Sequence, residues 1–319
     1  MVLRLDSKPE HLQKKNQSDS SKRVYIGLDI GKTKVSAGTI TESGKILLKS
    51  QLPTELEKGG QAIINQGRDL IRYMLKNCTT KPNGIGIGSS GVVDPKQGVI
   101  VSSGSIPKWN NIRIKSSFER EFKMPVAVDN DVIVAALGEH FFGAGKGVNT
   151  SVFMVISTGV GFCVIKEGKI WRGSHNLAGQ IAHLPLFSKG RIVNDMFGGK
   201  GISERASLVL QRQVSTDEVF RLASTNSADA KRVIEEATES AALTIAWIQN
   251  TVDPDIFIIG GGVALSEATF LENVRLKAEQ LLEKYKTQLP LGITIAPAKL
   301  GSDAGLVGCV ALFQNPTNF

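Results

Sequence analysis

The sequence predicts a two-lobed α/β protein in which the element order β-β-β-α-β-α occurs twice. A glycine-bearing loop follows a β-branched run at residues 24–34 and again at residues 152–161, and the strand and helix patterns after the first loop begin again near residue 151. With 319 residues, 41% of them hydrophobic, the chain can form two compact cores. Two copies of one unit imply two lobes with a cleft between them.

The first lobe is predicted to span residues 24–142. Three apolar runs predict a meander of strands, and apolar residues at helical spacing predict the first helix. A buried strand then leads directly into the second helix. The predicted strands cover residues 24–29, 35–40, 45–51, 84–88 and 126–129, and the predicted helices cover about 63–75 and 131–142.

The second lobe is predicted to span residues 143–319, and its last helix is a candidate to return to the first lobe. The predicted strands cover residues 151–157, 161–166, 169–171, 256–259 and 293–296. The predicted helices lie near residues 203–213, 228–251, 267–286 and 303–313. The irregular stretch between residues 171 and 203 is predicted as loop.

The chain has a formal charge of +8, part of which lies in a polar tail, residues 1–23. The tail carries six basic and three acidic side chains, so the rest of the chain has a charge of +5. This tail has no hydrophobic periodicity, so it is predicted to be disordered. It is too short for a helix-turn-helix domain, and its acidic residues argue against a transit peptide. A moderately basic body is typical of an enzyme that handles ATP and anionic products. We therefore expect no nucleic acid as a partner.

Targeting and redox signals indicate the cytoplasm. No apolar run approaches the ~20 residues that span a bilayer, and the N-terminal residues lack a secretory apolar segment, so no membrane partner is expected. The three cysteines are widely spaced. This spacing predicts free thiols in a reducing compartment, and neither a disulfide framework nor a zinc ribbon.

The two glycine-bearing loops are candidate phosphate-binding loops. Glycine lets backbone N–H groups approach phosphate oxygens closely, and a neighbouring Thr or Ser adds a hydroxyl donor. Either loop alone could be a simple hairpin turn, but the pair favours a nucleotide clamp. Neither loop is G-x-x-x-x-G-K-[ST], and a strand-loop-strand context is not that of a dinucleotide-binding fold.

The pair Asn130-Asp131 lies where a buried strand ends and a helix begins. Asp is a favourable residue at a helix start, so capping is one interpretation. The carboxyl ends of strands in α/β domains are also where ligands bind, which is the other interpretation. Gly88–Asp94 and Gly260-Gly261-Gly262 each follow an apolar strand and could likewise be simple turns.

In these ordered motifs, from Val24 to Phe313, the chain resembles the ROK family (repressor, open reading frame, kinase). The family includes ATP-dependent glucokinases, fructokinases and N-acetylmannosamine kinases. The resemblance implies the ribonuclease H-like fold of the actin, hexokinase and Hsp70 type. It also implies ATP-dependent phosphorylation of a hexose or N-acylhexosamine hydroxyl, with ATP and Mg²⁺ as cofactors and a homodimer as the assembly.

The resemblance also implies roles for individual residues. Asp131 is the general base, Asn130 orients neighbouring hydroxyl groups, and Asp29 lies near the Mg²⁺ as an indirect ligand. The implied ATP- and phosphate-binding residues are Asp29, Gly31, Lys32, Thr33, Lys34, Ser157, Thr158, Gly159, Gly161, Gly260, Gly261 and Gly262. The implied sugar-binding residues are Ser90, Gly91, Asn110, Asn130, Asp131, Gln180, His183 and Asn194.

The chain departs from the family in several positions. The family's Glu-x-Gly-His reads Gln180-Ile181-Ala182-His183, and residues 188–195, where its cysteine-rich zinc motif would stand, contain no cysteine. No structural zinc is therefore expected, and packing is expected to hold this loop. His183 is then either a sugar contact or a structural residue.

The amides at Gln180 and Asn194 stand in place of the family's sugar-binding glutamates. An amide adds a hydrogen-bond donor and no longer repels anions, which suggests an altered sugar; drift within a glucose or N-acylhexosamine pocket is the milder interpretation. Lys32 replaces a glycine and either reaches a phosphate or points into solvent. These departures also motivate an alternative, a sugar- or nucleotide-binding regulator with weak turnover.

Overall fold

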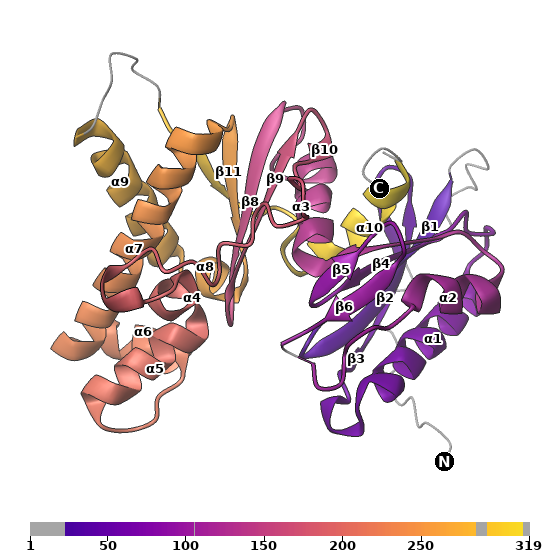
Figure 1. Cartoon of the computed structure of the whole chain (residues 1–319), viewed down its shortest axis with the longest axis horizontal. Helices are drawn as coiled ribbons and strands as arrows, with labels where there is room; N and C mark the ends of the chain where they lie inside the picture. Colours follow the sequence, from indigo (N-terminus) through magenta and orange to yellow (C-terminus); the bar gives the residue numbers. More distant parts are fainter. Residues whose placement is uncertain (1–22, 105, 285–291, 315–319) are drawn as a thin grey trace, which may run out of the picture.

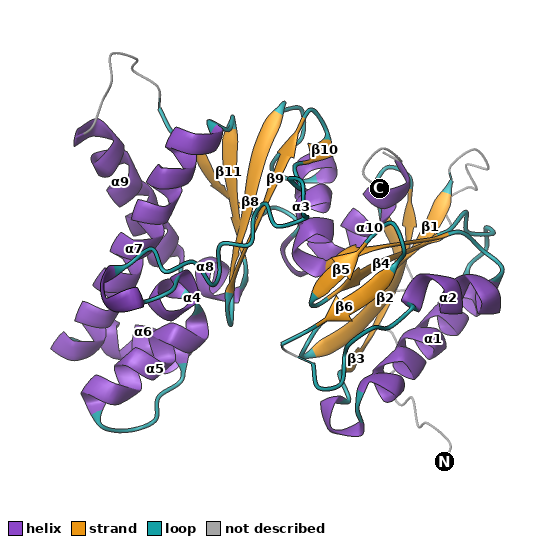
Figure 2. Ribbon diagram, viewed as in Figure 1, coloured by secondary structure: helices purple, strands orange, loops and turns teal. Residues whose placement is uncertain are grey.

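The computed structural model describes residues 23–104, 106–284 and 292–314 (Figure 1). It contains two five-stranded mixed sheets, one from each half of the chain. Two helices, α3 (Asp131–Phe142) and α10 (Ala304–Gln314), lie between the sheets (Figure 2). The predicted basic tail falls on residues 1–22, outside the described part, apart from Arg23.

The first sheet has the strand order β3-β2-β1-β4-β7. The strands are β1 (Val24–Ile30), β2 (Lys34–Thr41), β3 (Ile46–Pro53), β4 (Ile85–Ser89) and β7 (Val126–Asn130). The first three are antiparallel, and β1, β4 and β7 are parallel. Helices α1 (Gly60–Asn77) and α2 (Ile114–Phe122) bury their apolar faces against one side of it. A short hairpin of β5 (Val92–Asp94) and β6 (Val99–Ser102) completes this half, with the turn η1 (Leu56–Lys58).

The second sheet repeats this plan in the order β10-β9-β8-β11-β12. Its strands are β8 (Thr150–Ile156), β9 (Val160–Lys166), β10 (Lys169–Ile170), β11 (Ile256–Gly260) and β12 (Ile295–Pro297). Its helices are α4 (Val193–Phe197), α5 (Gly199–Leu210), α6 (Thr216–Ser224), α7 (Ala228–Val252), α8 (Gly262–Ser266) and α9 (Ala268–Lys284), with 3-10 turns η2 (Ser188–Gly190) and η3 (Gly301–Asp303). Again three strands are antiparallel and two are added in parallel, so the predicted duplication is present.

The sequence prediction omitted the shorter elements. The hairpin β5–β6 and helices α2, α4, α6 and α8 have only three to nine residues each. Such short segments leave too few repeats of a hydrophobic period to be detected. Strand β12 begins two residues later than predicted, and strand β8 ends before Ser157 because the chain turns there, where the N–H of Ser157 bonds to the carbonyl of Gly159.

Helices α3 and α10 cross in close contact, with glycine residues at the crossing point. A Cβ added at Gly308 would lie 1.7 Å from the carbonyl oxygen of Val134, and one at Gly138 would lie 2.4 Å from that of Ala304. Helix α10 also packs on the first sheet, where a Cβ on Gly86 would lie 2.3 Å from the carbonyl oxygen of Cys309. The last helix of the chain is therefore part of the first half's packing. We propose residue 143 as the lobe boundary, because α3 ends at residue 142 and the next strand joins the second sheet.

The two chain segments that cross between the lobes meet at one buried carboxylate. Glu139, on α3, is fully buried and accepts hydrogen bonds from the backbone N–H groups of Ala144 at 3.0 Å, Lys299 at 3.0 Å and Leu300 at 2.6 Å. Ala144 lies on the segment that leaves α3 for the second sheet, and residues 299–300 lie on the segment that returns from it. Glu139 therefore ties both connections together.

Glu139→Gln is expected to destabilise the protein by about 2–4 kcal/mol, because an amide keeps one acceptor and turns its N–H₂ group toward backbone N–H groups. Urea denaturation measures the change. Glu204→Gln, at an exposed position on α5, is the matched control and should stay within about 0.5 kcal/mol of wild type. Equal stability of the two variants would contradict the assigned role.

Candidate active site

The parallel strands β1, β4 and β7 end at one edge of the first sheet. Their register pairs Ile30 with Ser89 and Ser89 with Asn130. This register places Asp29, one residue before the end of β1, near the junction of β7 and α3, where Asp131 begins the helix. The two carboxylates predicted as Mg²⁺-proximal residue and general base therefore lie at the same edge.

Asn130 and Asp131 form a rigid strand-to-helix junction. The side-chain oxygen of Asn130 caps α3 by accepting from the N–H groups of Val132 at 3.0 Å and Ile133 at 3.3 Å. Its Nδ2 donates to the carbonyl of Gly91 at 2.9 Å and to Oδ1 of Asp131 at 2.9 Å. All four hydrogen-bonding positions of the amide are used in this way. The capping interpretation was made for Asp131, whereas Asn130 is the residue that caps the helix; Asn130 also fixes the Asp131 carboxylate.

The surroundings of both carboxylates raise their pKa values. Burial raises the pKa of Asp131, opposed by hydrogen bonds from Val132 and Asn130. Burial, together with the nearby charge of Asp131, raises the pKa of Asp29 from 3.8 to about 7, against the opposing charges of Lys34 and Lys49. Helix α10 encloses Asp29, since a Cβ on Gly305 would lie 2.9 Å from Oδ2 of the carboxylate. Two partly buried carboxylates thus lie close together at this edge, and the charges of Lys34 and Lys49 oppose the effect on Asp29 only in part; such a concentration of negative charge attracts a divalent ion.

The raised pKa of Asp29 makes stability depend on pH. Between pH 3.8 and about 7 the folded state keeps a proton that the unfolded state has released, so stability falls as pH rises through this interval. Asp29→Asn removes that loss. Its gain in the free energy of unfolding over wild type is therefore expected to grow from about pH 5 to about pH 7 and then level off. Urea denaturation across this range measures it.

Asp69→Asn, at an exposed position on α1, is the control for this titration and should show a difference from wild type that does not change with pH. A gain in the Asp29→Asn variant that is likewise independent of pH would contradict the raised pKa. A carboxyl NMR titration of wild type supplies a second, direct measurement of the Asp29 pKa.

A pocket with a volume of about 140 Å³ opens beside this junction. The first half contributes residues of the β7–α3 junction, and the second half contributes β9 and the segment that follows β10. Its lining includes Asn130, Val132, Gly161, Phe162, Arg172, Asn176 and Gln180. A Cβ on Gly161 would lie 2.7 Å from a methyl group of Val132, so β9 closely approaches the helix that carries Asp131. Of the predicted sugar-binding residues, Asn130 and Gln180 line this pocket.

An ion pair joins the two halves at the wall of the pocket. The guanidinium of Arg172, after β10, pairs with the carboxylate of Asp129, on β7. Asp129 is buried, and burial raises its pKa while the contact with Arg172 lowers it. Sequence analysis missed both residues. A charged residue inside the apolar run of β7 was the only available signal for Asp129, and no local pattern pointed to Arg172.

A second pocket, with a volume of about 400 Å³, lies at the second glycine-bearing loop. Ser157 and Thr158 of this loop meet Gly262, at the start of α8. The remaining lining residues come from helices α5, α6 and α8 and the residue before α6, and are Gly199, Lys200, Ser203, Ser215, Thr216, Asp217 and Val263. The structure thus brings the loop and the predicted adenosine segment together. The residues of α5 and α6 escaped sequence analysis because no local pattern shows that these helices fold against the loop.

The first glycine-bearing loop is a tight hairpin between β1 and β2. The N–H of Gly31 bonds to the carbonyl of Lys34 at 3.0 Å, and Oγ1 of Thr54 donates to the carbonyl of Gly31 at 2.8 Å. Lys32 and Thr33 are exposed, so Lys32 points into solvent, the second of its two interpretations. Neither pocket has a residue of this loop in its lining among the described residues.

The other predicted sugar-side residues are absent from the described lining of this pocket, and the structure does not bring all of them to the junction. Gly91, with a φ of 111°, meets Asn130 through its carbonyl. Asn110 and His183 are exposed. Asn194 lies against the second glycine-bearing loop, where its Oδ1 accepts from the N–H of Val160 at 2.8 Å. Asn194 thus contacts the second glycine-bearing loop through its side chain.

The segment 188–195 is held by hydrogen bonds as well as by packing. The N–H of Val193 bonds to the carbonyl of Leu184 at 3.1 Å, and Nε of Arg205 donates to the carbonyl of Asp195 at 3.1 Å. Among residues 23–104, 106–284 and 292–314, no group of three or more His, Cys, Asp or Glu side chains could hold a metal ion. A structural zinc therefore does not fit the side chains of this segment.

All three cysteines are free thiols. Cys163 and Cys309 are buried, and burial raises the pKa of Cys163 to about 12. Within the described part of the chain, no helix is long and apolar enough to cross a membrane.

The ROK family model matches residues 25–316. The chain belongs to the ROK family. An uncharacterized protein of Clostridium perfringens is 33% identical over 300 residues, which cover 92% of this chain and 99% of that protein. A glucokinase of Halalkalibacterium halodurans is 29% identical over 315 residues, which cover 90% of this chain and 94% of the relative. A xylose repressor of Caldicellulosiruptor bescii is 24% identical, over 90% of this chain and 77% of the repressor.

Solved ROK structures share the fold. The ROK hexokinase of Thermus thermophilus superposes with a TM-score of 0.83 at 27% identity, covering 93% of this chain and all of that one. A ROK glucokinase of Streptomyces griseus, in complex with glucose and AMPPNP, superposes with a TM-score of 0.76 at 26% identity, covering 91% and 98% of the two chains. The predicted family and the predicted two-lobed α/β fold class are therefore confirmed.

Proposed function

We propose that this ROK protein transfers the γ-phosphoryl group of ATP to a hydroxyl group of a hexose or N-acylhexosamine. One observation carries the proposal: the Asp131 carboxylate, with a raised pKa, is fixed by Asn130 and the N–H of Val132 beside a pocket between the lobes. A general base needs this combination of fixed geometry and a pKa shifted toward neutrality. The similarity to glucokinases, and to a structure with glucose and AMPPNP, supports the assignment.

In the proposed reaction the oxygen of the acceptor hydroxyl attacks the γ-phosphorus, and Asp131 takes the proton of that hydroxyl. The bond from the γ-phosphorus to the bridging oxygen breaks, and ADP leaves. Phosphoryl transfer requires mainly positioning and charge stabilisation from the protein. Asn130 supplies the positioning, because its amide holds the carboxylate and the start of α3 at the same time. Closure of the lobes would exclude water from the reaction.

The nucleotide is proposed to occupy the pocket of Ser157, Thr158 and Gly262, with its phosphates toward the β1–β2 hairpin. Mg²⁺ takes one or two carboxylates together with phosphate oxygens and water. Asp29 fits the role of the indirect carboxylate, because burial and the nearby charge of Asp131 raise its pKa to about 7, and a bound cation would relieve both effects. Bound Mg²⁺ would supply charge neutralisation of the phosphates. Binding of ATP is proposed to involve both glycine-bearing loops only after the lobes close.

On the acceptor side, Gln180 and Asn176 of the second lobe are proposed to contact the sugar, opposite Asn130. An amide at position 180 accepts a wider range of substituents than a carboxylate, because it does not repel anions. We also propose a cytoplasmic location and a homodimer, which the resemblance to the family supports.

A coupled ADP-release assay tests the proposal over hexoses, N-acylhexosamines and acidic sugars with Mg·ATP. Turnover on one of these sugars, absent in Asp131→Asn, is the expected result. If no sugar gives turnover above that variant, the kinase proposal fails. The acidic sugars in the panel test whether the amide at position 180 widens acceptor choice.

The second candidate function is a sugar- or nucleotide-binding regulator. The similarity to a xylose repressor and the amides at positions 180 and 194 favour it. The intact Asn130–Asp131 junction, with its raised carboxylate pKa, opposes it. Sugar binding by calorimetry without ATP-dependent turnover would favour the regulator.

A further inference from the structure

We propose that Arg205 is a positioning residue that couples the nucleotide side of the site to the acceptor side by holding helix α4 in place. The proposal rests on the proposed kinase function for its kinetic consequences. Its structural part, the coupling of two segments through α4, stands on contacts within the protein and is tested without ligands below.

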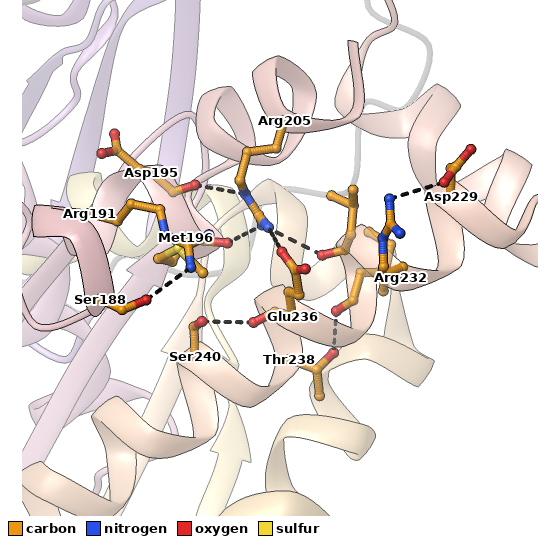
Figure 3. Close-up of polar contacts among 12 residues, drawn as sticks. Ser188, Arg191, Asp195, Met196, Arg205, Asp229, Arg232, Glu236, Thr238 and Ser240 are labelled. Carbon is orange, nitrogen blue, oxygen red and sulfur yellow. Dashed lines mark hydrogen bonds and ion pairs between the residues drawn. The ribbon is translucent and has the colours of Figure 1, made fainter. Parts of the chain in front are cut away.

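The guanidinium group of Arg205, on α5, forms hydrogen bonds with residues of helices α4 and α7 (Figure 3). Its Nε donates to the carbonyl of Asp195 at 3.1 Å, its Nη2 to the carbonyl of Met196 at 2.6 Å, and its Nη1 to Glu236 of α7 at 2.6 Å. Only 15% of the side chain is exposed. The last carbonyls of a helix lack partners within it, so the planar five-donor guanidinium satisfies α4 and fastens it to α7.

On one side α4 contacts the second glycine-bearing loop. Besides the bond from Val160 N–H to Asn194 of α4, the N–H of Gly199, the first residue of α5, donates to the carbonyl of Ser157 at 2.8 Å. A Cβ on Gly198 would lie 3.3 Å from the carbonyl oxygen of Thr158, so the end of α4 and the loop are in close contact. The positions of α4 and of the start of α5 therefore set the position of the loop proposed to hold phosphates.

On its other side α4 contacts the acceptor wall. The N–H of Asn194 donates to the carbonyl of Ala182 at 3.0 Å, and that of Val193 donates to the carbonyl of Leu184 at 3.1 Å. Ala182 and Gln180 line the pocket beside Asp131. Asn194 thus joins both sides, with its backbone bonded to the acceptor wall and its side chain to the phosphate loop.

Arg205 itself is absent from the lining residues described for either pocket, so it acts through α4. Catalytic groups must be held within about 0.5 Å of their productive geometry, and loss of the anchor would let both segments move together. The expected kinetic signature is therefore a change in how strongly nucleotide and sugar affect each other's binding, in addition to a lower kcat.

The test compares Arg205→Met, which keeps the stem and removes the donors, with Arg232→Met. Arg232 lies on α7 in the same view, is 59% exposed, and pairs only with Asp229 among the ion pairs of the described residues (Figure 3). Hydrogen exchange is measured first, without ligand. Exchange in residues 157–160 and 180–184 is expected to rise together by about tenfold in Arg205→Met and to stay unchanged in Arg232→Met. Unchanged exchange in Arg205→Met would overturn the proposal.

Calorimetry then measures the affinity for AMPPNP with and without glucose, or with the best acceptor from the assay above. We expect the factor by which the sugar increases the affinity for AMPPNP to fall toward one in Arg205→Met. We also expect kcat to fall by about 10- to 100-fold. Retention of wild-type coupling in a folded Arg205→Met protein would overturn the proposal. Glu236→Gln replaces Arg205→Met if the latter does not fold, with a smaller increase in the same exchange rates expected. Absence of turnover in wild type, with the exchange pattern intact, would contradict the kinase function and leave the coupling through α4 supported.

Discussion

Asp131→Asn is expected to lower kcat by about 10²- to 10⁴-fold while the protein folds and binds nucleotide as wild type does. The asparagine oxygen can still accept from Asn130 and from the N–H of Val132, and asparagine is accepted at the start of a helix. The change therefore removes the proton acceptor and little else. Steady-state kinetics with the best sugar measure kcat and KM, and calorimetry with AMPPNP measures nucleotide affinity.

Asp229→Asn is the control for this loss, because Asp229 is a half-exposed residue at the start of α7. It should keep kcat within about twofold of wild type. If Asp131→Asn retained more than about a tenth of wild-type kcat, another group would have to accept the proton, and the assigned role would be wrong.

Gly308→Ala is expected to destabilise the protein by about 3–5 kcal/mol or to prevent folding. The added methyl group would lie 1.7 Å from the carbonyl oxygen of Val134 and 3.0 Å from the N–H nitrogen of Gly138, both of them backbone atoms that cannot rotate away. Helices α3 and α10 would have to separate. Urea denaturation, followed by circular dichroism, measures the change.

Gly104→Ala is the matched control, because an added Cβ there meets no atom within 4 Å. A Gly308→Ala protein as stable as the control would contradict the close crossing of the two helices. A folded but weakened Gly308→Ala protein should also lose activity, because α3 carries Asp131 at its first turn.

The elements that could be predicted from sequence are those with a local cause. The junction at residues 130 and 131 combines a buried strand, a good capping residue and an apolar helix, so its boundary was predicted to within one residue. The duplicated sheet followed from repeated strand patterns of ordinary length. Short elements and long-range partners could not be found in this way, because no local pattern shows which distant segment folds against a given strand.

Two residues show this limit for the site. Arg172 reaches Asp129 from a segment without regular structure, and the pairing exists only because the second sheet lies beside the first. Asn194 was assigned to the sugar by its place in the motif, whereas its side chain contacts Val160 of the glycine-bearing loop. A motif gives the order of residues along the chain, but it does not show which neighbouring segment each side chain contacts in the folded protein.

All four hydrogen-bonding positions of the Asn130 amide are occupied within the protein, and this has a consequence for how acceptor preference can change among such proteins. Among the described residues, the hydrogen bonds to the Asp131 side chain come from Asn130 and Val132 of the first half, whereas Asn176 and Gln180 belong to the second. Mutations in residues 176–182 can therefore accumulate without touching the contacts of the carboxylate that we propose as the base. A combinatorial library of this segment that keeps Gly179, where an added Cβ would lie 2.6 Å from the carbonyl oxygen of Phe162, should yield variants with new acceptors, which makes this segment the place to evolve the protein.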